Sequence, residues 1–142
     1  MSDTTPAAFD PKPRQVKAVL NMIAGEAILA GDVVAFASTG VDDTVMKALS
    51  SIGSPLGVAL YSQATVGGKI AVACAGSILM VKEGAGSDIL AGTGLMTYTV
   101  AGTVVGATVA ADAQVIGFAI SKIAANSTGY AQIDYTFVGK GA

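Results

Sequence analysis

The chain lacks several residues on which catalytic and metal sites commonly depend. It contains no His and no Trp, and Cys74 is its single cysteine. A disulfide within the chain is therefore impossible, and Ser-His and Cys-His nucleophile systems are excluded. Thiolate and imidazole metal sites lack ligands for the same reason. A single cysteine fits synthesis in a reducing cytoplasm.

Charge is also scarce. Only 13% of the 142 residues are charged, the formal net charge is -2, and 52% of the residues are hydrophobic. This balance excludes a disordered, highly charged chain and a nucleic-acid-binding protein with a strongly basic face. The length and apolar content predict one domain with a buried core.

Two stretches resemble membrane signals. The apolar run 18–25 follows basic residues, but Asp3 and three prolines precede it, and Glu26 and Asp32 follow it, which argues against a signal peptide. Residues 89–111 carry no charge and are long enough to span a bilayer. Thr and Val alternate there between glycines, so the pattern favours strands and turns, and no membrane partner is expected.

The sequence pattern of the rest of the chain is typical of an all-β protein. From Val16 onward, short runs of β-branched and apolar residues are cut by glycine. Apolar residues alternate over Leu56, Val58 and Leu60, and again over Ile70, Val72 and Cys74, which predicts a buried thiol. The segment 42–49 fits a short capped helix or an edge strand, and the strand is favoured.

An internal sequence repeat predicts a duplicated building block. AGEAILAG at 24–31 returns as AGSDILAG at 85–92, and the strand pattern apolar-Gly-apolar-Ala-apolar occurs at 56–60 and at 116–120. At an offset of 61 residues, Gly68 pairs with Gly129 and the alternating strand at Ile70 pairs with the one at Ala131. Both matches keep the in-and-out phase of the strands, which chance identities in an Ala-rich chain do not require. Six glycines are predicted to serve structural turns or bulges: Gly31, Gly57, Gly68, Gly92, Gly117 and Gly129.

No constellation of residues indicates catalysis. The carboxylate pairs Asp42 with Asp43 and Glu83 with Asp88 lie in turn-like polar stretches, where solvated loop charges are expected. The Gly-rich stretch 84–92 lacks the third glycine of a dinucleotide loop, and 138–142 shares only a Gly-Lys pair with a phosphate loop. We therefore expect no enzyme activity, no cofactor and no metal.

The N-terminal segment differs from the rest. Residues 1–20 contain Pro6, Pro11 and Pro13 and show neither strand nor helix periodicity, which predicts an extended arm before a β domain at 21–142. Its basic residues outnumber its acidic ones, so it suits docking on an acidic protein surface, although a solvated tail fits the same composition. The candidate contact residues of the arm are Phe9, Lys12, Arg14 and Lys17.

The motifs resemble a family of small bacteriophage proteins that decorate, or cement, the outside of the capsid. The family pattern G-D-x-V, then G-V-A, then G-x-x-I-x-V-A-x-x-G, then I-G-x-A and a final apolar strand spans about residues 25–137. It is matched by Gly31-Asp32-Val33-Val34, by Gly57-Val58-Ala59, by Gly67 with Ile70, Val72, Ala73 and Gly76, by Ile116-Gly117-Phe118-Ala119, and by Ile133-Asp134-Tyr135.

The resemblance implies a compact, barrel-like β-tulip domain that forms a homotrimer on the outer capsid surface of the virion. Its implied partner is the major capsid protein, which it would clamp against the pressure of packaged DNA. The arm would then be the capsid-docking segment, adding a strand to an exposed sheet edge. A receptor- or carbohydrate-binding module of a phage fibre or surface appendage is the alternative, and it requires an exposed aromatic platform.

Overall fold

The computed structural model describes residues 9–36, 42–49, 55–106 and 115–134. These residues form strands and turns without any helix, so the all-β prediction is confirmed. The strands are β1 (Val19–Ala24), β2 (Val33–Phe36), β3 (Thr44–Lys47), β4 (Pro55–Ala59), β5 (Lys69–Ala73), β6 (Ile78–Lys82), β7 (Gly94–Thr97), β8 (Val104–Gly106), β9 (Val115–Ala119) and β10 (Thr128–Ile133). The described residues contain no helix with the length and apolarity to cross a membrane.

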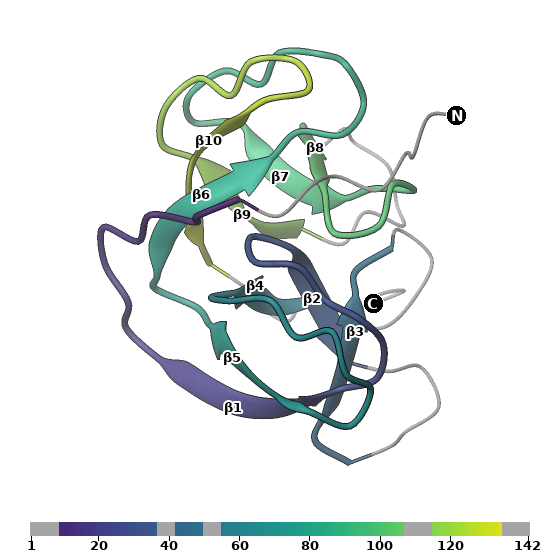
Figure 1. The fold of residues 1–142 in the computed structure, drawn as a ribbon. Coiled ribbons are helices and arrows are strands. Elements are labelled where there is room, and N and C mark those ends of the chain that lie inside the picture. The colour runs from purple at the N-terminus through teal and green to yellow at the C-terminus, as the bar shows by residue number, and fades with distance from the viewer. Residues whose placement is uncertain (1–8, 37–41, 50–54, 107–114, 135–142) are drawn as a thin grey trace, which may run out of the picture.

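The first half of the chain is a closed barrel. Its strands are ordered β1-β3-β2-β4-β5. β1 closes the barrel by pairing antiparallel with β5 and parallel with β3, where Ile23 lies opposite Thr44. Figure 1 shows this barrel in its lower part. The strand predicted within 42–49 is β3.

The second half repeats the same strand order. Its sheet runs β6-β10-β9-β7-β8, so β6 corresponds to β1, β8 to β3, β7 to β2, β9 to β4 and β10 to β5. Figure 1 shows this half above the first. β7 and β8 lie within 89–111, which confirms strands for that uncharged stretch. A single parallel bridge between Glu83 and Val104 links the two ends of this sheet. The structure thus bears out the internal duplication.

One pairing inferred from the sequence has to be corrected. Val72 lies opposite Ala59 in the first half and Ala131 opposite Ala119 in the second, so Val72 and Ala131 are equivalent. Ile70 therefore corresponds to Gly129, and not to Ala131. Gly68 precedes β5, whereas Gly129 lies inside β10. The shift is even, so the predicted faces of the strand survive it.

Equivalent irregularities occur in β4 and β9. The register shifts where Gly57 lies opposite Val34 and where Gly117 lies opposite Leu95. A β-carbon on Gly57 would overlap the main-chain oxygen of Ala73, and one on Gly117 would overlap that of Gln132. Both glycines therefore permit a close backbone approach at a bulge.

The bulge in β4 also changes which face of the strand its side chains occupy. Leu56, Val58 and Leu60 were expected on the same side of their strand. Instead Leu56 packs against the cluster inside the first barrel, while Val58 and Leu60 belong with the other cluster. An extra residue in one strand reverses the alternation beyond it, which explains the difference.

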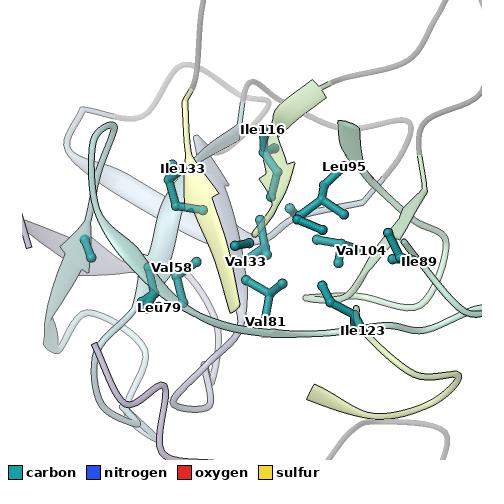
Figure 2. Close-up of a cluster of buried hydrophobic side chains, with 14 of the residues drawn as sticks. Val33, Val58, Leu79, Val81, Ile89, Leu95, Val104, Ile116, Ile123 and Ile133 are labelled. Carbon is teal, nitrogen blue, oxygen red and sulfur yellow. The ribbon is translucent and has the colours of Figure 1, made fainter. Parts of the chain in front are cut away.

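The two halves share a hydrophobic core. The smaller cluster fills the first barrel and includes Ile28, Ile70 and Cys74, which confirms the buried thiol. The larger cluster contains the inner side chains of the second half together with Val33, Ala35, Ala48, Val58 and Ala73 from the first. Figure 2 shows Val33 and Val58 among the side chains of the second half. Burial of this apolar surface holds the halves together.

Candidate interaction surface

The described part of the arm lies along β6 of its own chain. The Arg14 N–H donates to the Ile78 carbonyl at 2.8 Å, the Ile78 N–H to the Gln15 carbonyl at 2.8 Å, and the Met80 N–H to the Pro11 carbonyl at 2.7 Å. Figure 1 shows this purple segment crossing β6 before the chain descends to β1. These bonds satisfy main-chain groups at the edge of the second sheet.

Three of the four candidate contact residues, Phe9, Arg14 and Lys17, pack against the body of the protein. A β-carbon on Gly76 would come 2.9 Å from Lys17 Cγ. The ring of Phe9 fills the space that a β-carbon on Gly31 would need, and the Phe9 N–H donates to the Ala30 carbonyl at 3.3 Å. The guanidinium carbon of Arg14 lies 3.8 Å from the centre of the Tyr130 ring, a cation–π contact. Phe9 thus contacts the first half, whereas Arg14 contacts the second.

The two lysines are exposed. The Lys12 N–H donates to Asp10 Oδ1 at 2.9 Å, and the Lys17 N–H donates to Ser77 Oγ at 3.2 Å. The structure fixes their backbone and leaves their ammonium groups at the surface. Contact of the four residues with a capsid stays a prediction.

The predicted arm, residues 1–20, ends inside an exposed apolar strand, because Val19 and Leu20 already belong to β1. β1 carries no charged residue, and its Val19, Leu20 and Ile23 side chains are 45%, 45% and 39% exposed. Val16, just before it, is 41% exposed. Val19 and Ile23 share one face of β1, whereas Leu20 lies on the other face. Exposed apolar side chains on one face of a strand are typical of a contact surface between proteins. Sequence reasoning missed this surface because the same residues also suit a buried strand.

Glu83 is buried, contrary to the prediction that it is a solvated loop charge. Its carboxylate accepts hydrogen bonds from the N–H groups of Ala85 at 2.7 Å, Gly86 at 2.8 Å and Asn126 at 2.8 Å. Burial alone would raise the pKa of Glu83, but these backbone bonds outweigh it and lower the pKa. The residue connects β6 with two loops of the second half and has a structural role.

The other three members of the two carboxylate pairs, Asp42, Asp43 and Asp88, are exposed, as predicted. Asp88 forms an ion pair with Lys122 at 3.3 Å and accepts a hydrogen bond from the Ala125 N–H at 2.9 Å. These two hydrogen-bonding partners lower the pKa of Asp88. Asp42 and Asp43 flank the start of β3. An exposed ion pair of this kind contributes little to stability.

Asp32 is a buried acid that sequence reasoning did not single out. It is 4% exposed, and its Oδ2 accepts the Leu29 N–H at 2.9 Å. Desolvation by burial raises the pKa of Asp32 to about 6, against the lowering effects of the Leu29 N–H and Lys47. Gly102 of the second half lies against this carboxylate, since a β-carbon there would come 2.5 Å from Asp32 Oδ1. The sequence signal that could have identified Asp32 is its position directly after Gly31 in the turn.

Within the described ranges, no three His, Cys, Asp or Glu side chains gather as metal ligands would. The features that stand out are surfaces and buried structural acids.

Comparison with solved structures gives a match to the crystal structure of the head fiber gp8.5 N base of bacteriophage phi29. The TM-score is 0.59 and the sequence identity 20%, and the match covers 84% of this chain and 95% of that chain. Protein-family models and curated protein sequences give no match. At this identity the likeness shows a shared fold, and the chain has the fold of that head fiber base.

Proposed function

We propose that the chain is a structural protein of a bacteriophage virion, mounted on the outer surface of the head, and that it acts by protein contact without catalysis. The observation that supports this most is the fold shared with the phi29 head fiber base over 95% of that chain. The resemblance of the glycine and apolar motifs to those of capsid decoration proteins supports the same location. The low charge and the exposed face of β1 fit a protein that works through contacts.

A homotrimer bound to the major capsid protein is the proposed form of attachment. The exposed side chains of Val19 and Ile23, which share one face of β1, offer each subunit a surface for contact with another protein. In a trimer, contacts that are weak singly become effectively intramolecular after the first, which raises avidity by roughly a hundredfold or more. The protein would then reinforce the junctions between capsid subunits.

A head fiber base is the second candidate function, and the same structural likeness favours it. In this role the domain anchors a fibre that carries receptor or carbohydrate binding. Phe36 and Tyr61 are aromatic side chains exposed by 40% and 45%, so the surface presents aromatic groups of the kind that stack on sugars. The two roles differ in whether a fibre is attached to the domain.

The test uses purified virions of the phage that encodes the chain. Quantitative mass spectrometry should find the protein in them, and antibodies against it should label intact heads. Light scattering of the purified protein should give three times the mass of a 14.0 kDa chain. Electron microscopy of the labelled heads should show no fibre beyond the labelled protein if it is a decoration protein, and a projecting fibre attached to it if it is a fibre base. Protein abundant in the lysate but missing from virions would refute both.

A further inference from the structure

The tetrapeptide Ile-Leu-Ala-Gly forms the same turn twice. Gly31 has φ 88° and Gly92 has φ 86°. The Gly31 N–H donates to the Ala59 carbonyl at 2.9 Å, and the Gly92 N–H donates to the equivalent Ala119 carbonyl at 2.7 Å. Each turn also begins with an antiparallel bridge, Ile28 with Gln63 and Ile89 with Ile123. Residues 28–31 and 89–92, named here the first and second turn, therefore share their sequence, the glycine conformation and these main-chain pairings.

The two turns differ in what covers them. The ring of Phe9 lies on Gly31, and the Phe9 N–H bonds to the Ala30 carbonyl, so Gly31 is buried. No atom of the described residues lies within 4 Å of the corresponding β-carbon position on Gly92, and Gly92 is exposed. Leu90 is 65% exposed, while its counterpart Leu29 is half-buried. The second turn is thus an uncovered copy of a covered site.

The first turn shows what kind of group fits the second. Its occupant is a phenylalanine on an extended segment, and it uses one main-chain N–H and an aromatic ring. A glycine at positive φ leaves room for the ring. Because the residues of the two turns are identical, the second offers the same carbonyl, at Ala91, and the same space.

We propose that the second turn is a docking site for a phenylalanine on an extended segment of a partner protein, bound as Phe9 is bound on the first turn. Each chain has two turns but one Phe9. Exchange of arms between copies would therefore leave half of the turns uncovered, so a separate protein is the occupant that fills them. The inference rests on the duplicated turn and is independent of the proposed role in the virion.

The experiment adds the arm sequence to the full chain as a separate peptide. A peptide of residues 5–15, TPAAFDPKPRQ, is titrated into the isotopically labelled full chain while amide NMR shifts are followed. We expect saturable shifts at Leu90, Ala91 and Gly92, and at least about tenfold weaker binding of the matched peptide with Phe9→Ala. The Leu90→Glu variant should lose these shifts. Val66→Glu, which changes a side chain 68% exposed in another loop, should keep them.

The proposal is overturned by any of three results. The first is shifts confined to residues 28–31, which would mean that the peptide only displaces the chain's own arm. The second is equal binding of the Phe and Ala peptides. The third is no saturation at the second turn up to about 2 mM peptide, the weak end of measurable affinity. Both protein variants change highly exposed side chains, and their amide spectra will show that they fold.

Discussion

The two halves have the same strand order but are closed differently. In the first half, β1 and β3 pair in parallel at Ile23 with Thr44 and at Ala24 with Val45. In the second, the counterpart is one bridge from Glu83 to Val104. The Gly25 N–H bonds to the Val45 carbonyl at 2.8 Å, and the Gly84 N–H bonds to the Val104 carbonyl at 3.0 Å. The buried carboxylate of Glu83 thus occupies the position equivalent to Ala24, at the point where the sheet of the second half is less completely closed.

The arm adds to this asymmetry because it contacts both halves. Phe9 covers a turn of the first half, while Pro11 to Gln15 lie along β6 of the second. The segment therefore ties the two copies together, covering the turn of one and the sheet edge of the other. A duplicated unit can therefore keep its backbone plan while its two copies offer different surfaces.

The first prediction concerns the bulge that both halves contain, and it carries the greatest loss of stability. Gly57→Ala and Gly117→Ala should each lower the free energy of unfolding by about 3 kcal/mol or more, because the new β-carbon overlaps a main-chain oxygen across the bulge. Gly106→Ala is the control, since its β-carbon would come no closer than 3.5 Å to any atom of the described residues. Urea unfolding measures all three. A tolerated substitution at either bulge would remove the claim that they are equivalent.

A second prediction concerns the buried acid of the first half, whose counterpart is Thr93. Folding raises the pKa of Asp32 from 3.8 to about 6. The folded state therefore holds a proton that the unfolded state releases in this window, and stability falls as the pH rises through it. The loss at pH 7 is up to about 3 kcal/mol.

The Asp32→Asn variant checks this sign. An amide oxygen can still accept the Leu29 N–H, and the variant has no charge to bury. Relative to it, the wild type should lose about 2 kcal/mol of unfolding free energy between about pH 4 and pH 7. The reference is Asp88→Asn, which changes an exposed acid. A difference between wild type and Asp32→Asn that is constant across the window would contradict the burial of Asp32.

The third prediction concerns the second half alone. Glu83→Gln should cost about 1–3 kcal/mol at pH 7, because an amide oxygen replaces a carboxylate that accepts three backbone N–H groups. The pKa of Glu83 is lowered from 4.5, so the stability it contributes is present above that value and disappears as the pH falls through the folded pKa. Urea unfolding at two pH values should show the cost shrinking in acid. A cost that persists unchanged there would point to packing instead.

The smallest effect concerns the arm. Phe9→Ala should lower the free energy of unfolding by roughly 1.5 kcal/mol, because a half-buried aromatic ring loses its contact with Gly31. Lys12→Ala is the matched control in the same segment and should be neutral, since that side chain is exposed. Calorimetry can compare the two. Equal melting temperatures for Phe9→Ala and wild type would mean that the ring does not hold the arm.

Local patterns could be predicted from the sequence, and long-range closure could not. The repeated Ile-Leu-Ala-Gly and the period-2 strands predicted an all-β duplication because both signals lie within short segments. The bulge before Val58 and the match of Ile70 with Gly129 depend on pairing between strands. Burial of Glu83 likewise depends on N–H groups up to 43 residues away, at Asn126, which no local pattern reveals.

The most direct test of this account compares the two turns in one molecule by NMR. Because the Phe9 ring lies on Gly31 and no described residue covers Gly92, the α-protons of Gly31 should show a ring-current shift that Gly92 lacks. Phe9→Ala should abolish the shift at Gly31 and leave Gly92 unchanged. Alike signals at both glycines in the wild type, or equal changes at both in the variant, would contradict one covered and one open copy of the same turn.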